Sequence, residues 1–219
     1  MKKIPAFASL LCVVLATAVP VSAAPSGRGL IFGINAGISP TVWFYNAYRF
    51  GVEAGFRFSE RFALVAEASY GSATYESSAG WRETLYINSA KTTYTVLPVS
   101  LTLSYFAPVS DRLAVCLGFG GGYYSLSITS KVEDQGYYYY PQTTTETEKA
   151  QAFAPHLCLG FEYELLKKVV IIGEVRQSAG KSKISTTDPY GFNSEQDISF
   201  GGIQVKIGLR VYLGGSDNS

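Results

Sequence analysis

A histidine, a cysteine and two glutamates alternate along one short stretch of the chain: His156, Cys158, Glu162 and Glu164. Side chains of an extended strand point alternately to its two faces, so these even-numbered residues share one face. A thiol nucleophile, an imidazole base and a carboxylate are the groups that acyl transfer or hydrolysis requires. The cluster stands alone, however, and no further catalytic motif accompanies it. We therefore favour a histidine hydrogen-bonded to a neighbour and predict no catalytic residue.

Two further patterns suggest sites that we do not expect to form. Cys116 would complete a possible metal-ligand set with His156 and Cys158, but two strands and a single imidazole are a poor basis for one. The glycine-rich residues 118–122 suggest a phosphate-binding loop, yet no helical pattern follows to supply the helix dipole. A strand packed against bulky side chains explains these glycines better, and we predict neither a metal nor a cofactor.

Aromatic residues between the predicted strands are the best candidates for binding. Exposed tyrosine and tryptophan give a large contact area at low entropic cost. They predict contact with host molecules, glycans or lipopolysaccharide, although packing on each other or at the membrane interface explains them equally well. These loop residues are Trp81, Tyr86, Tyr137, Tyr138, Tyr139, Tyr140 and Tyr190.

The elements that position these residues are strands rather than helices. The 219-residue chain carries 16 tyrosines and 22 glycines, a composition typical of strands and tight turns. Its formal net charge is +1, and no basic stripe is present, which argues against a nucleic-acid partner.

The first 23 residues read as an export signal. Lys2 and Lys3 precede an apolar run over residues 4–18, and Val21, Ser22 and Ala23 form a small-x-small cleavage site. The apolar run is shorter than the roughly 20 residues that a membrane-spanning helix needs. We predict cleavage after Ala23. Of the three cysteines, Cys116 and Cys158 then remain, and they could form a disulfide in an oxidising compartment if the strand register brings them together.

Eight segments alternate between apolar and polar residues. The last, residues 202–213, sets a continuous apolar face against one that carries Lys206 and Arg210. Most segments reach the roughly 9–11 residues that a membrane-spanning strand needs. The segments are residues 30–38, 49–58, 62–70, 97–105, 113–123, 156–165, 169–177 and 202–213.

The connections between these segments alternate in length. Short turns are expected at residues 59–61, 108–112 and 166–168, and longer polar loops at residues 40–48, 73–92, 130–149 and 178–197. Short turns at one rim and long loops at the other are typical of transmembrane barrels, and eight antiparallel strands can close into one.

With this pattern the chain resembles the small outer-membrane β-barrel proteins of Gram-negative bacteria, the OmpA/OmpX-like and porin-family domain. Residues 55–70 and 97–106 look like typical hairpin segments of that family, and the resemblance covers about residues 28–213. Such proteins end in an assembly signal, which Lys206, Gly208, Val211 and Leu213 match, although this chain ends its last strand in leucine rather than an aromatic residue. The resemblance implies outer-membrane lipid, lipopolysaccharide and the barrel-assembly machinery as partners.

The composition of the polar face indicates whether the barrel is surrounded by lipid or by water. This face is rich in glycine, as a narrow lumen requires, and carries both signs of charge; an unpaired buried charge would cost several kcal/mol. Aromatic residues near strand ends, Phe58, Phe62, Tyr70, Tyr94, Tyr105, Phe106 and Tyr163, would form interfacial girdles. The predicted lumen charge network is Arg49, Glu53, Arg57, Glu67, Glu162, Glu164, Glu174, Arg176, Lys206 and Arg210.

We therefore predict an all-β protein: a signal peptide (residues 1–23), an eight-stranded antiparallel up-and-down transmembrane barrel (24–213) and a short tail (214–219). The N-terminus and the short turns would face the periplasm. The expected role is structural or surface interaction without catalysis. The alternatives are a narrow porin-like channel, a lipid-modifying outer-membrane enzyme and a secreted lipocalin-like ligand-binding barrel.

Overall fold

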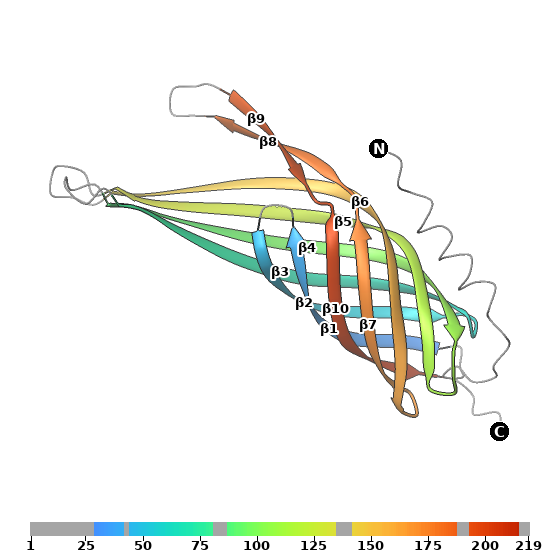
Figure 1. Cartoon of the computed structure of the whole chain (residues 1–219). Coiled ribbons are helices and arrows are strands. Elements are labelled where there is room, and N and C mark those ends of the chain that lie inside the picture. The colour runs from blue at the N-terminus through green and yellow to red at the C-terminus, as the bar shows by residue number, and fades with distance from the viewer. Residues whose placement is uncertain (1–28, 42–43, 81–86, 135–141, 188–192, 215–219) are drawn as a thin grey trace, which may run out of the picture.

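The computed structural model describes residues 29–41, 44–80, 87–134, 142–187 and 193–214. Eight strands form a closed antiparallel barrel, in which the first strand pairs with both the second and the last (Figure 1). This confirms the predicted fold class. The barrel strands are β1 (Gly29–Thr41), β2 (Phe44–Arg57), β3 (Phe62–Gly80), β4 (Ile87–Pro108), β5 (Leu113–Asp134), β6 (Gln142–Leu166), β7 (Val169–Ser178) and β10 (Gly202–Leu213).

A two-stranded hairpin, β8 (Lys181–Thr187) and β9 (Asn193–Ser199), stands between β7 and β10 in the chain and projects beyond the barrel (Figure 1). The predicted signal peptide, the aromatic residues at 81, 86, 137–140 and 190, and the tail beyond residue 214 lie outside the described residues. Within the described part of the chain, no helix is long and apolar enough to cross a membrane.

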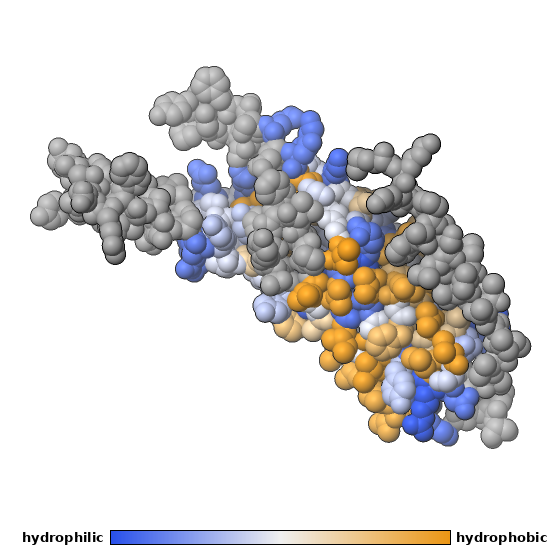
Figure 2. Space-filling model, in the orientation of Figure 1, coloured by the Kyte–Doolittle hydropathy of each residue, from blue (hydrophilic) through white to orange (hydrophobic). Residues whose placement is uncertain are grey.

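The outer face of the barrel is apolar because the two-residue period of every strand has the same phase. Val52 of β2, Leu101 of β4 and Ile207 of β10 are 61%, 50% and 61% exposed. Figure 2 shows hydrophobic surface gathered on the barrel, with hydrophilic surface concentrated toward the ends. Exposed apolar surface of this extent marks contact with an apolar phase.

The inner face changes character along the barrel axis. At the end that carries the short turns, Ile31, Phe106, Val170, Ile172 and Tyr212 are buried together. Farther along, the buried side chains are charged. The charged part therefore sits on an apolar base.

Four strands continue well beyond the other four, which corrects the predicted loops. Residues 73–92 and 130–149 are mostly strand, because β3, β4, β5 and β6 have 19, 22, 22 and 25 residues. Both faces of these extensions carry serine, threonine and charged residues, so they lack the alternation that indicates a strand in the sequence. Likewise, the predicted loop 178–197 contains most of the β8–β9 hairpin.

An apolar cluster stabilises this extension above the barrel. We call it the upper cluster: Tyr124, Leu126, Ala150, Ala152, Ala154 and Phe200. The ring centroids of Tyr124 and Phe200 lie 6.2 Å apart, and the Phe200 amide donates to the Gly180 carbonyl at 2.8 Å. The hairpin base is thereby held against the inner face of the extended sheet.

Two of the predicted girdle aromatics do not face outward. Phe106 is fully buried in the lumen, and Tyr94 packs against the upper cluster. Consecutive strand residues point to opposite faces, so Tyr105 and Phe106 could not both face outward. Phe58, Phe62, Tyr70 and Tyr163 are exposed on the outside, and the Phe62 and Tyr105 ring centroids lie 5.3 Å apart.

A charge on the outer face should be costly only where the surface meets lipid. We call the apolar outer face of the barrel the belt. Leu101→Arg, near the middle of the belt, should lower the free energy of unfolding in liposomes by about 2–4 kcal/mol. Tyr75→Arg, on the extension, should change it by less than about 0.5 kcal/mol. Urea unfolding of the refolded variants measures both, and equal losses would contradict a lipid belt that excludes the extension.

Candidate functional site

The lumen charges form connected layers, and the lowest surrounds Glu162 of β6. The Tyr212 hydroxyl lies 2.8 Å from both carboxylate oxygens, and Arg57 Nη1 lies 3.6 Å from Oε2. The guanidinium of Arg57 also donates to the Glu60 carbonyl at 2.7 Å and lies 4.4 Å from the Phe106 ring centroid. This layer ties strands β2, β4, β6 and β10 together near the short turns.

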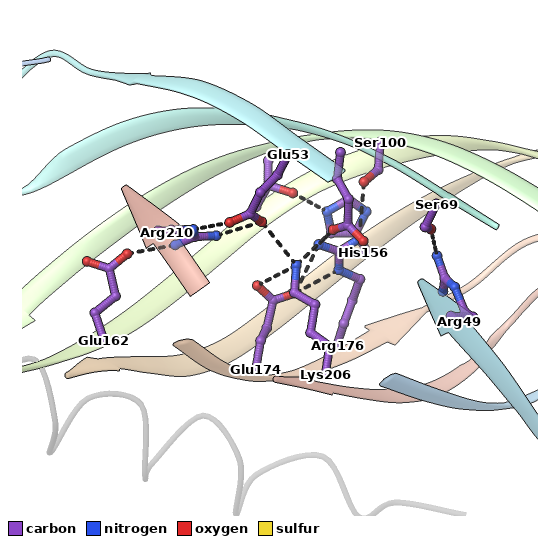
Figure 3. A network of polar contacts seen from close by, with 12 residues as sticks. Arg49, Glu53, Ser69, Ser100, His156, Glu162, Glu174, Arg176, Lys206 and Arg210 are labelled. Atoms are coloured by element: carbon purple, nitrogen blue, oxygen red, sulfur yellow. Dashed lines mark hydrogen bonds and ion pairs between the residues drawn. The ribbon is translucent and has the colours of Figure 1, made fainter. Parts of the chain in front are cut away.

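Arg210 of β10 links this layer to the next. Its Nη1 donates to Glu162 Oε1 at 2.7 Å, its Nη2 donates to Glu53 Oε2 at 3.1 Å, and its Nε also bonds Glu53 (Figure 3). Glu53 and Glu162 are 3% and 1% exposed. The planar guanidinium can serve two carboxylates at once because its donors point in fixed, divergent directions.

The third layer centres on Lys206 and Arg176, which share two glutamates (Figure 3). Lys206 Nζ lies 2.8 Å from Glu67 and 3.3 Å from Glu174. Arg176 lies 2.8 Å from Glu67 and 2.9 Å from Glu174, and it donates to Ser100 Oγ at 3.1 Å. Five strands, β2, β3, β4, β7 and β10, thus contribute to the second and third layers.

Arg49 stands above these layers and differs from the other lumen cations. It donates to Gln204 Oε1 and to Ser69 Oγ, and the described residues offer it no carboxylate within ion-pair distance. Figure 3 shows Arg49 and Ser69 set apart from the ion-paired groups.

Glycines on the lumen face make room for these long side chains. A methyl group on Gly33 would lie 2.6 Å from Glu53 Oε1, and one on Gly120 would lie 2.8 Å from His156 Nε2. Either contact is too close for a real carbon atom. The glycine-rich residues 118–122 are part of strand β5, which confirms the prediction of a strand rather than a phosphate-binding loop.

The predicted network residues do not all come together. Glu164 is half-buried near the β6–β7 turn and has no ion pair among the described residues. Tyr212, Ser69, Ser100 and Gln204 take part although sequence reasoning did not select them. The inward phase of their strands was the available signal, since Tyr212 and Gln204 alternate with the apolar residues of β10.

The candidate catalytic groups have structural partners instead. His156 Nε2 lies 2.8 Å from Thr102 Oγ1, while Glu162 bonds Arg210 and Tyr212. Among the described residues, no group of three or more histidine, cysteine, aspartate or glutamate side chains could hold a metal ion.

Cys116 and Cys158 are both buried free thiols. The register of β5 and β6 sets Cys158 opposite Gly118 and Cys116 opposite Gly160. The two cysteines are therefore offset by two residues rather than directly paired, and the disulfide considered from sequence is not formed.

The residues of the predicted assembly signal divide between the two faces of β10. Lys206 and Gly208 face the lumen, whereas Val211 and Leu213 are exposed on the outer face at 39% and 49%. Their role in recognition by the assembly machinery stays a prediction.

A charged lumen inside an apolar belt is the architecture of bacterial outer-membrane barrels. The family model described as "Outer membrane protein beta-barrel domain" matches residues 9–210. The chain belongs to this family. No curated protein matches it significantly.

Two solved outer-membrane proteins share the fold of this family member. The outer membrane protein OprG from Pseudomonas aeruginosa is 12% identical, with a TM-score of 0.59 over 89% of this chain and 100% of OprG. A major outer membrane protein from Thermus thermophilus is 12% identical, with a TM-score of 0.53 over 85% of this chain and 99% of that protein. Identities this low establish the fold alone.

This outer-membrane β-barrel protein is thus located in the bacterial outer membrane. Its belt faces lipid, and in such barrels the short turns face the periplasm while the longer connections face outward. The extension of β3–β6 and the β8–β9 hairpin lie at the end opposite the short turns, which we call the outward end.

Loss of the Arg210 guanidinium should destabilise the barrel strongly. In Arg210→Gln, Glu53 and Glu162 stay buried without this cation, so we expect a loss of about 3–5 kcal/mol in the free energy of unfolding. Urea unfolding in liposomes, followed by tryptophan fluorescence, measures it.

The exposed pair Lys91–Glu76 provides the control. Its ion pair is 2.7 Å long, and the Lys91 hydrogen bond lowers the pKa of Glu76. Lys91→Gln should nevertheless leave the urea midpoint almost unchanged, because water screens an exposed ion pair. The double variant Glu53→Gln with Arg210→Gln should recover part of the Arg210→Gln loss, and strictly additive losses would contradict the proposed coupling.

Proposed function

We propose that this protein is a non-enzymatic outer-membrane barrel with a closed lumen, which displays an extended β-sheet for contacts at the cell surface. The observation that carries the proposal is the length of β3–β6, which run far beyond the belt and pair with each other out to their far ends, Gly80 with Ile87 and Asp134 with Gln142. A barrel that served only to span the membrane would not need this extension.

The ion-pair layers support a closed lumen. Eight strands leave an interior that side chains can fill. Here Arg210, Lys206 and Arg176 join glutamates from opposite sides of the barrel. An ion passing this region would have to displace several buried ion pairs, and this argues against the porin-like alternative.

The extended sheet offers a free edge. The last β3 residue that pairs with β2 is Ser72, so residues 73–80 pair only with β4 among the described strands. An unpaired edge exposes backbone donors and acceptors that can bind another extended chain. Tyr75 on this segment is 63% exposed and offers an aromatic contact beside the edge.

The candidate aromatic loop residues follow directly from these strands in the chain. Trp81 comes immediately after β3, Tyr137–Tyr140 lie between β5 and β6, and Tyr190 lies between β8 and β9. Their positions in the sequence therefore fit a role at the outward end.

The charge of the extension narrows the kind of partner. Acidic residues outnumber lysines there, which favours a host protein or a neutral glycan over a polyanion. The strand residues concerned are Glu76, Glu133, Asp134, Glu146, Glu148, Glu195 and Asp197 against Lys91, Lys131, Lys149, Lys181 and Lys183.

Two other partners follow from the barrel itself. We propose lipopolysaccharide as part of the lipid around the belt, and the barrel-assembly machinery as the partner that reads Lys206, Gly208, Val211 and Leu213.

Surface contact can be tested by adherence. A non-adherent laboratory bacterium that expresses the protein should bind cultured epithelial cells more than its empty-vector parent. Replacing Tyr137–Tyr140 with serine should return adherence to the parent level, because the aromatic contact area is lost.

The matched control is Lys167→Ser, in the β6–β7 turn at the opposite end of the barrel, and it should leave adherence unchanged. Surface levels are equalised with an epitope tag. Unchanged adherence of the tyrosine variant, at equal surface level, would remove the aromatic loop from the proposal.

The closed lumen has a separate test in planar bilayers. The wild-type protein should give no steady conductance, whereas Arg210→Ala combined with Lys206→Ala should give discrete openings. Conductance in the wild type that changes with Glu53→Gln would instead establish the channel alternative.

A further inference from the structure

Arg49 is a buried cation without a counterion among the described residues. It is 9% exposed, and its two hydrogen bonds go to neutral acceptors, Gln204 and Ser69. Its Nε is buried and has no hydrogen-bond partner. Arginine stays protonated in proteins, so it cannot relieve this by losing its charge.

A second orphaned donor lies beside it. Asn35 is 8% exposed, and its Nδ2 is likewise buried without a partner. The β1–β2 register sets Gly37 opposite Arg49, so Asn35 is the diagonal neighbour of Arg49 on the same face. Both side chains line one cavity, together with Gln204, Lys206 and other residues of the third layer.

The charges around this cavity do not balance. Its lining includes three cations, Arg49, Arg176 and Lys206, but only two carboxylates, Glu67 and Glu174. Both carboxylates already bond Lys206 and Arg176. Glu53 also lies 3.8 Å from Lys206, but it is already bonded by Arg210. The half-buried Glu164 lies near the turn at the far end of the lumen and cannot neutralise Arg49.

We propose that the cavity between Arg49 and Asn35 binds a small inorganic anion of the size of chloride. Two unsatisfied donors and one excess positive charge require an acceptor that carries negative charge, because an unpaired buried charge costs several kcal/mol. The cavity has little more room than a single small body needs, which favours a monatomic anion over phosphate and other oxyanions.

Bound chloride would complete the polar network at its outward end. The third layer and Arg49 would then form a neutral unit, in which Arg49 holds β2, β3 and β10 together through the anion, Ser69 and Gln204. The inference does not depend on the proposed surface role, since it concerns only the lumen.

The test compares salts at equal ionic strength. The full chain refolded into detergent micelles should unfold at a higher Tm in sodium chloride than in sodium gluconate. The difference in Tm should increase with chloride concentration, and above the dissociation constant it should increase with the logarithm of that concentration. Arg49→Gln should have the same Tm in both salts. Arg61→Gln, which removes an exposed turn arginine, should keep the wild-type difference.

Asn35→Asp provides a second variant that does not remove the arginine. Its carboxylate would stand where the anion binds, so the Tm should no longer depend on chloride. Crystals of the wild type soaked in bromide should show one anomalous peak between Arg49 Nε and Asn35 Nδ2. Equal Tm values in both salts for the wild type, chloride dependence retained by Arg49→Gln, or water at the bromide position would overturn the proposal.

Discussion

The ion pairs of Arg210 with Glu53 and Glu162 depend on closure of the barrel, and the closure in turn depends on the two-residue period of its strands. These three residues come from β10, β2 and β6 and meet only because the sheet curls back on itself. Within lipid, backbone groups must all be paired, and a closed barrel pairs them without an edge. Closure then forces one face of every strand inward, so the charged residues of that face must satisfy each other. In each layer of the lumen, neighbouring inward-facing residues meet that requirement by forming ion pairs and hydrogen bonds with each other.

Glycine and charge share the inner face for one physical reason. A barrel of eight strands is narrow, and each long arginine or lysine side chain needs space that another residue leaves free. Gly33 lies against Glu53, and Gly120 lies against His156. The imidazole is therefore a packed, hydrogen-bonded part of the lumen wall.

The sequence predicted the barrel and its inward charges because apolar alternation with constant phase is directly visible along each strand. The sequence could not predict which of the inward charges pair with each other. Glu162 and Glu164 look alike in the sequence, yet Glu162 meets Arg210 and Tyr212 while Glu164 lies at the lumen's end. Which charge lies opposite which depends on register and stagger across several strands. The extension was missed because serine and threonine on both faces leave no periodic signal, so only pairing with neighbouring strands defines it.

The extension also explains why the upper cluster lies where it does. Four long strands standing beyond a barrel would leave their inner face in water, and a sheet needs a hydrophobic face or a packing partner to be stable by itself. Tyr124 and Leu126 of β5 pack there against alanines of β6, and Phe200 closes the cluster from the base of the β8–β9 hairpin. The hairpin thus supplies the apolar contact to the extended sheet that β7 and β10 are too short to make. The apolar contacts of the upper cluster hold the outward sheet in place, while the ion pairs below it link opposite strands across the lumen. The two ends of the molecule are therefore stabilised by different physical interactions.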